Sequence, residues 1–349
     1  MSNASLTQSG FDFQDCAAIV LFFDFIKDIV RIRIEGKAED IEITLVDNKR
    51  IYSQAKYCGI DDQESRAITV FKDALRTLSS SDTSDCVQLI YATNILRPFG
   101  KNTPIVDFPK NGDDNVLLDY DELSSDGKSI VDKIIKSSGY SINTSKLSFR
   151  IIGYHGSKPR NRYSVLYREL ESFVSKINSS TFHINQEQII SSIFDLIKLN
   201  KTNPDLTITL SKEDIIWTFI VQVLPSVSRD FIDDLEPAIQ YEVQRLFSDY
   251  ISQYEERIDF VTKVIYDYKQ WRSSHPADGK YDRFVADTWK SYREEFDSIS
   301  TDDSILECFI KLVLYRVLSC RYFIKNVKEA AGIVVKSGKD NRRTIFQRD

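Results

Sequence analysis

Glycine and proline are scarce in this sequence. Its 349 residues include 12 glycines and 8 prolines, against 21 phenylalanines and 17 tyrosines. Because glycine and proline interrupt helices, their scarcity favours long helices. The sequence also contains no P-loop, GxGxxG, GxSxG or HExxH pattern and no internal repeat. It therefore carries no signature of a phosphate-binding loop, a dinucleotide-binding turn, a serine hydrolase or a zinc protease.

Patterns for zinc, disulfides and membranes are missing as well. The five cysteines form no CxxC pair and their number is odd, which favours free thiols in a reducing cytosol. The histidines, His155, His183 and His275, have no zinc-ligand spacing with one another or with cysteine. The most apolar helical run, Ile305 to Leu318, is too short for a membrane span and contains charged residues. With no signal-peptide pattern, we expect a cytoplasmic protein that does not bind membranes.

The composition is that of a globular protein with an acidic surface. Hydrophobic residues make up 42% and charged residues 28% of the chain, and the length suggests two domains. The net charge of -6 argues against nucleic-acid binding over the whole surface, but it leaves room for a local basic groove.

The most informative stretch is residues 31–56, which predicts three short strands. Apolar and polar residues alternate in three segments, 31–35, 41–45 and 51–56. Asp40 opens the middle strand. Gln54 and Lys56 lie two apart on the third strand, so they share one face of the sheet.

Four polar residues of this stretch suggest a catalytic site. Glu35 and Asp40 supply carboxylates and Gln54 an amide oxygen, which are ligands that Mg²⁺ or Mn²⁺ accepts. Lys56 beside such a metal can orient the attacking water and stabilise charge that develops on phosphorus. The pattern predicts metal-assisted hydrolysis of phosphodiesters. A charged strand edge that prevents aggregation is the simpler alternative.

The order acid, acid, then Gln-x-Lys resembles the PD-(D/E)xK nuclease superfamily. Within it, the chain looks like the DUF4297 nuclease domain of bacterial anti-phage effectors, including those of CBASS and Lamassu systems. The resemblance covers roughly residues 8 to 95. It rests on Gly10–Ala18 before an apolar helix, Ile34-Glu35, Glu39-Asp40-Ile41, Gln54-Ala55-Lys56 and Ile90–Asn94.

The resemblance implies an α/β restriction-endonuclease-like core with defined roles for the matched residues. Asp40 would be the principal metal carboxylate, assisted by Glu35 and Gln54, and Lys56 would position the water. The family's equivalent of Gln14 sits near the active site. Gln54 departs from the usual Asp or Glu, which removes one negative charge from the metal site. DNA phosphate could then be needed to complete the site.

The remainder of the chain turns mostly helical after Tyr163. We therefore expect a nuclease domain over residues 1–165 and a helical regulatory and assembly domain over 166–349. Residues 101–145 are polar and indicate a large loop with one helix near 128–137.

A basic loop precedes the helical half. Lys158, Arg160 and Arg162 could contact DNA phosphates, and a solubilising linker is the alternative interpretation.

A free nuclease is toxic to its own cell, so we expect its activity to be gated. The cyclic-nucleotide-sensing domain of CBASS effectors has no signature here. The resemblance therefore points to the nuclease subunit of a Lamassu-type complex. It implies double-stranded DNA as substrate, an SMC-like ATPase and an accessory subunit as partners, and a homo-oligomer on activation.

Two alternatives stay open at this point. A catalytically inactive nuclease fold could serve as a scaffold that binds partner proteins. A stand-alone restriction enzyme would cut a defined site without a partner, but the sequence shows no element for reading bases.

Overall fold

A computed structural model describes residues 3–36, 39–59, 63–108, 115–155, 159–177, 182, 184–205, 207–226, 235–252, 257–276 and 280–333. The chain forms two compact units. The first takes in the chain up to Phe173 together with Gln186–Lys212, and the second takes in Val174–Asn185 and the chain from Glu213 onward. The first unit thus extends past the expected boundary at residue 165, because α6 (Gln186–Thr202) contacts strand β1 and because strand β7 pairs with β1.

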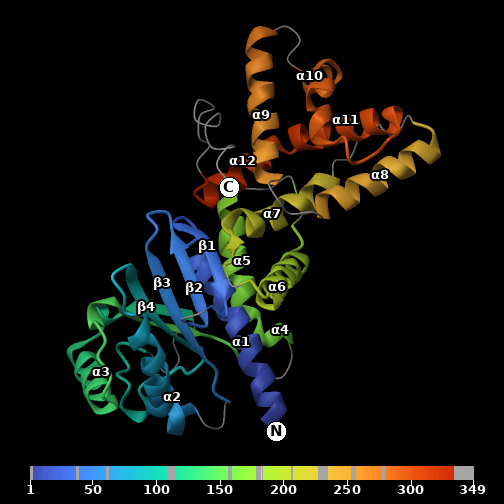
Figure 1. The fold of residues 1–349 in the computed structure, drawn as a ribbon. Helices are drawn as coiled ribbons and strands as arrows, with labels where there is room; N and C mark the ends of the chain where they lie inside the picture. Colours follow the sequence, from blue (N-terminus) through green and yellow to red (C-terminus); the bar gives the residue numbers. More distant parts are fainter. Residues whose placement is uncertain are drawn as a thin grey trace. The chain divides into compact units, whose positions relative to one another are not determined.

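The first unit is built on one mixed sheet, with seven strands among the described residues in the order β5-β6-β4-β3-β2-β1-β7 (Figure 1). Strands β3, β4 and β6 are parallel, and the other neighbours are antiparallel. The alternation in residues 31–56 predicted β1 to β3 correctly. The strands are β1 (Ile29–Ile34), β2 (Ile41–Leu45), β3 (Arg50–Lys56), β4 (Cys86–Thr93), β5 (Asn115–Asp119), β6 (Leu147–Ile152) and β7 (Leu210–Ser211).

Helix α1 (Asn3–Asp24) packs on the sheet through a fully buried apolar stretch. Ala17, Leu21 and Phe22 are at most 1% exposed. The hydrophobic periodicity predicts a helix that runs to Val30, but the helix ends at Asp24 and β1 begins at Ile29. Pairing of Ile29 with β2 favours the strand there over another helical turn.

Helices α2 (Gln63–Leu78) and α3 (Ser125–Ser138) form a second core with the sheet. Phe71 of α2 lies 5.0 Å from the ring of Tyr91 and 5.5 Å from that of Phe149, measured between centroids. Tyr91 and Phe149 come from β4 and β6, so these aromatic contacts fix α2 across the parallel strands. The remaining helices of this half are α4 (Pro159–Arg162) and α5 (Ser164–Ile177).

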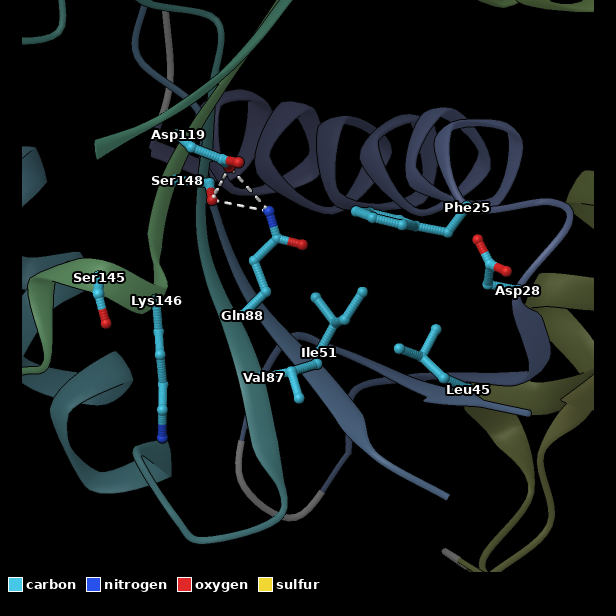
Figure 2. Close-up of a pocket in the computed structure, with 10 residues that line it drawn as sticks. All are labelled: Phe25, Asp28, Leu45, Ile51, Val87, Gln88, Asp119, Ser145, Lys146 and Ser148. Carbon is cyan, nitrogen blue, oxygen red and sulfur yellow. Dashed lines mark hydrogen bonds between the residues drawn. The ribbon is translucent and has the colours of Figure 1, made fainter. Parts of the chain in front are cut away.

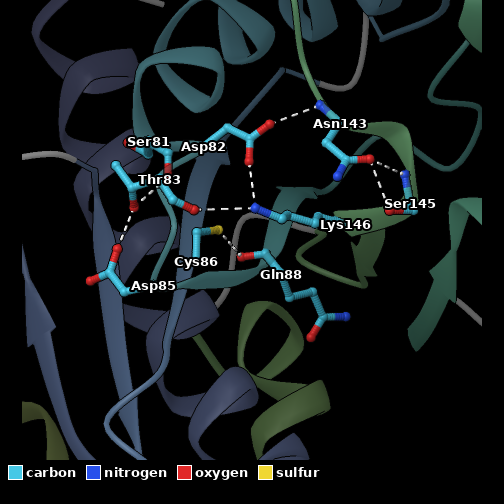
Figure 3. Close-up of polar contacts among 9 residues, drawn as sticks. All are labelled: Ser81, Asp82, Thr83, Asp85, Cys86, Gln88, Asn143, Ser145 and Lys146. Atoms are coloured by element: carbon cyan, nitrogen blue, oxygen red, sulfur yellow. Dashed lines mark hydrogen bonds and ion pairs between the residues drawn. The ribbon is translucent and has the colours of Figure 1, made fainter.

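The end of α2 is anchored by a polar cluster at the start of β4 and β6 (Figure 3). Lys146 donates to Asp82 Oδ1 at 2.7 Å and to the Thr83 carbonyl at 3.2 Å. The backbone N–H of Asn143 donates to Asp82 Oδ2 at 2.9 Å. These contacts hold the short helix η2 (Ser79–Ser81), which follows α2, against the rest of the sheet unit.

Arg150 on β6 is a deeply buried charge of the sheet unit with two ion-pair partners. Its guanidinium donates to both carboxylate oxygens of Asp24, at 2.8 and 3.0 Å, and lies 3.6 Å from Glu169. Burial raises the pKa of Asp24, and Arg150 opposes that rise. The cluster joins the end of α1 and helix α5 to the sheet.

The second unit is helical in its described residues. Trp217 and Phe219 of its first helix are buried, as their apolar pattern predicts. The apolar pattern of residues 304–331 predicts one long helix, but the structure has two, because α11 ends at Ser319 and the next residue, Cys320, leaves the helical region with φ and ψ of -92° and 4°. The helices are α7 (Lys212–Val223), α8 (Pro237–Ser252), α9 (Arg257–Ser274), α10 (Tyr281–Thr288), α11 (Asp303–Ser319) and α12 (Arg321–Ala330).

Strand β5 lies in the region that the sequence indicates as a loop. It pairs only with β6 among the described residues, at the edge of the sheet. Its residues are half-buried or exposed, so its short apolar stretch lacks a strong alternation.

Candidate active site

Strand register places Asp40 opposite Gln54. Ile41 of β2 is paired with Ser53 of β3 in an antiparallel arrangement, so the residue before Ile41 faces the residue after Ser53. The side chain of Gln54 lies on the α2 side, where its Oε1 accepts from Thr77 Oγ1 at 2.6 Å. The predicted sharing of one face by Gln54 and Lys56 follows from the continuous strand.

Asp40 is held by a short hydrogen-bond network. Its Oδ2 accepts from the Gln54 amide nitrogen and, at 3.0 Å, from the backbone N–H of Ala55. Its carbonyl accepts from Gln14 Nε2 at 3.3 Å and from the backbone N–H of Glu35 at 2.7 Å. Helix α1 and strands β1 to β3 therefore meet at Asp40. Four of the predicted site residues, Gln14, Glu35, Asp40 and Gln54, lie together at this corner of the sheet, which is called the corner below.

Lys56 completes this corner at the carboxyl end of β3. Burial raises the pKa of Asp40 above its usual range, and the positive charge of Lys56 is the largest influence that opposes the rise. A half-buried lysine whose charge acts on a neighbouring carboxylate is an arrangement found at functional sites as well as in structural ion pairs.

The Thr-Asn end of β4 fixes the backbone that follows Lys56. Thr93 Oγ1 donates to the Lys56 carbonyl at 2.9 Å. Asn94 accepts from the Cys58 N–H and donates to the Cys58 carbonyl, both at 2.8 Å. The Thr-Asn pair of the resemblance therefore has a structural role here, because it holds the segment that leaves the site.

Glu35 faces a different partner from the one expected. Its backbone has a positive φ of 55°, and its carboxylate lies 3.3 Å from Lys201 Nζ. Lys201 also pairs with Asp15 of α1 at 3.0 Å. Lys201 and Asp15 were not predicted as site residues, because Lys201 lies 166 positions beyond Glu35 and the sequence places it in the helical half.

Glu39 is a further acidic residue at the corner that the prediction left out. It is 4% exposed, and its Oε1 accepts from Ser81 Oγ at 2.9 Å. Burial raises the pKa of Glu39 to about 7, and nearby Asp40 adds to the rise. The only signal in the sequence was its place beside Asp40 in Glu-Asp-Ile.

The raised pKa of Glu39 predicts a specific pH dependence of stability. The folded state keeps the Glu39 proton between about pH 4.5 and 7, where the unfolded chain has lost it, so stability falls as pH rises through this window. The difference corresponds to about 3 kcal/mol. Glu39→Gln is therefore expected to unfold with a flatter pH dependence from about pH 5 to 8 in urea titrations. An unchanged pH dependence in the variant would show that Glu39 is ionised in the folded state throughout.

The donor chemistry of the corner suits a hard divalent cation, but its arrangement is closed. Asp40 Oδ2 is engaged by Gln54 and Ala55, and Glu35 by Lys201. Over the described part of the chain, no three His, Cys, Asp or Glu side chains are grouped so that they could hold a metal ion. A cation would thus require a rearrangement of these side chains.

The predicted DNA-binding residues are not gathered into a basic patch by the described structure. Arg160 is exposed on α4, whereas Arg162 is half-buried and lies 4.0 Å from Asp12 of α1. Lys158 lies outside the described residues.

A separate cavity of about 380 Å³ lies at the opposite end of the parallel strands (Figure 2). Gln88 Nε2 donates to Asp119 Oδ1 at 3.0 Å and to Ser148 Oγ at 2.7 Å, which leaves the amide oxygen facing the cavity. Asp28 and Asp119 make the lining acidic, and its one lysine, Lys146, is paired with Asp82. These charges disfavour a phosphate, so this cavity is not a candidate DNA site.

Comparisons with known proteins give one distant likeness. No family model and no curated protein matches the chain. A structure of the Cap4 SAVED/CARF-domain-containing receptor from Moraxella osloensis is similar at 15% identity, with a TM-score of 0.36. The match covers 63% of this chain and 48% of that one, less than half of the receptor. A similarity at this level establishes neither fold family nor function, so the resemblance to the DUF4297 domain stays a prediction.

The helices offer no candidate for a membrane span. Within the described ranges, none of them is both long and apolar enough to cross a bilayer.

Proposed function

We propose that this protein is a metal-dependent endonuclease that hydrolyses the phosphodiesters of double-stranded DNA. The observation that carries the proposal is the corner at the carboxyl end of β3, where Asp40 faces Gln54 across two strands and Lys56 follows on the same strand. A carboxylate and a lysine at the ends of neighbouring strands are the minimal constellation of a PD-(D/E)xK site, and the motif resemblance adds the restriction-endonuclease-like core.

The residues of the corner have distinct proposed roles. Mg²⁺ or Mn²⁺, held by Asp40 with Glu35 and Gln54, would act as a Lewis acid on the scissile phosphate. Lys56 orients the attacking water and stabilises negative charge on the phosphate oxygens. Water supplies the oxygen that bonds to phosphorus, the bond to the departing sugar oxygen breaks, and that oxygen takes up a proton. Gln14 holds the Asp40 backbone.

We further propose that the enzyme is an effector of bacterial anti-phage defence, activated by partner binding and oligomerisation. The support is the motif resemblance, which implies an SMC-like ATPase, an accessory subunit and self-assembly through the helical half. Gating also accounts for the closed arrangement of the corner, in which one oxygen of Asp40 and one of Glu35 are paired with protein groups.

The same closed arrangement favours one competing function. A scaffold without catalytic activity has no need of free carboxylates, and it would bind partner proteins through the same fold. Wild-type protein and Asp40→Asn, each fused to a domain that forces oligomerisation and compared on supercoiled plasmid with Mg²⁺ or Mn²⁺, separate the two. A gated nuclease predicts nicked and linear plasmid with the wild-type fusion and not with the Asp40→Asn fusion. Equal plasmid conversion by the two proteins would reject Asp40 as a catalytic residue.

A further inference from the structure

Lys201 of α6 occupies the acidic side of the corner as an internal cation. Its ammonium lies 3.0 Å from Asp15 and 3.3 Å from Glu35, and 5.2 Å from the centre of the Phe11 ring. The side chain of Lys201 is 14% exposed. A lysine so placed, between carboxylates of two different elements and over an aromatic ring, is a fixed charge rather than a solvated one.

The position of Lys201 is set by the residue before it. Asn200 is buried, and its Nδ2 donates to the Ile208 carbonyl at 3.0 Å, while its Oδ1 accepts from the backbone N–H of Ile34 at 3.5 Å. Arg33 of β1 donates to the carbonyl of the same Ile208. The end of α6 and the loop after it are thus hydrogen-bonded to the end of β1, directly beside Glu35.

The positive charge of Lys201 acts on the carboxylates around it. Its positive charge acts on Asp40 as well as on Asp15, and it opposes the effect of burial on the pKa values of both. An ammonium and a divalent cation compete for the same carboxylate oxygens, and two cations side by side repel each other. While Lys201 is paired with Glu35, the corner binds a divalent cation weakly.

We propose that Lys201 is a latch on the candidate active site: paired with Glu35 and Asp15, its ammonium keeps divalent cations out. This inference rests on the proposed nuclease function and names the regulation of that same site.

The test is a Mn²⁺ titration of the full chain, followed by the electron paramagnetic resonance signal of the free ion. Lys201→Met is expected to bind Mn²⁺ about tenfold more tightly than the wild type, because the competing charge is gone. Lys198→Met is the matched control, since Lys198 is an exposed lysine on the same helix. It should bind Mn²⁺ as the wild type does.

A second variant separates the latch from a loss of folding. Lys201→Gln keeps a donor for Asp15 but removes the charge, and it should also bind Mn²⁺ more tightly while it remains folded. Wild-type Mn²⁺ affinity in both folded Lys201 variants would overturn the latch. If they bind Mn²⁺ more tightly but Lys201→Met does not cleave DNA, the latch stands and the nuclease function fails. If the wild type cleaves DNA and the variants bind Mn²⁺ with unchanged affinity, the nuclease function stands and the latch fails.

Discussion

Replacing Lys56 by methionine is expected to slow DNA cleavage about a thousandfold, because one preorganised charge donor at a developing oxyanion contributes a factor of this order. Methionine preserves the length and the apolar stem of the side chain but cannot donate to water or phosphate. Lys56 is half-buried at the strand end, with its backbone held by Thr93, so the change should leave β3 in place. The rate is measured by conversion of supercoiled plasmid.

The matched control for Lys56→Met is another lysine of the same hairpin. Lys49→Met removes an exposed lysine whose ammonium lies 3.0 Å from Asp47 in the turn before β3. It should cleave at the wild-type rate and unfold at the wild-type midpoint, since exposed ion pairs contribute little to stability. A Lys56→Met protein that retains more than about a tenth of the wild-type rate would remove Lys56 from the mechanism.

Replacing Arg150 by methionine is expected to lower the free energy of unfolding of the sheet unit by about 2–3 kcal/mol, because it leaves the Asp24 carboxylate, whose side chain is 15% exposed, without its partner. The guanidinium is 3% exposed, and both of its hydrogen bonds to Asp24 are lost in the variant. A second change, Asp24→Leu, removes the stranded charge as well. The double variant should recover a large part of the loss.

The measurement on Arg150→Met must report on the unfolding of the sheet unit itself. The three tryptophans, Trp217, Trp271 and Trp289, all belong to the second unit, so tryptophan fluorescence does not report on the sheet. Hydrogen exchange of the backbone amides of β3, β4 and β6 reports on the stability of the sheet unit. A loss below about 1 kcal/mol in Arg150→Met would show that the pair contributes no more than a surface ion pair.

The sequence was sufficient for local features of the site and insufficient for contacts distant in the chain. Alternating residues predicted β1 to β3, and the two-residue period predicted that Gln54 and Lys56 share a face. Three residues that the motif resemblance groups together are also hydrogen-bonded in the structure, since Gln14 and Gln54 both donate to Asp40. The strand predictions succeed because the two-residue period of a strand is a local property of the chain, whereas the contact between Gln14 and Asp40 was implied by the motif resemblance.

The contacts that the sequence did not predict depend on tertiary packing. Lys201 reaches Glu35 because α6 packs on β1, and no local sequence pattern predicts that packing. Buried Glu39 has its hydrogen-bond partner in Ser81, which follows α2 and lies 42 residues further along the chain. Strand β5 is an edge strand whose half-exposed residues carry too little alternation to be distinguished from a loop. The expected boundary at residue 165 leaves α6 outside the first domain, whereas α6 lies in the first compact unit. Helical periodicity does not say which core a helix joins.

One measurement tests the nuclease corner most directly: plasmid cleavage by a fusion that forces the chain into an oligomer. The fusion removes the need for an activating partner, and it is compared with the same fusion carrying Asp40→Asn and Lys56→Met together. We expect the wild-type fusion to linearise plasmid with Mg²⁺ and the double variant to leave it supercoiled. Equal cleavage by the two fusions, or none by the wild-type fusion with either Mg²⁺ or Mn²⁺, would contradict the assignment of Asp40 and Lys56 as the catalytic pair.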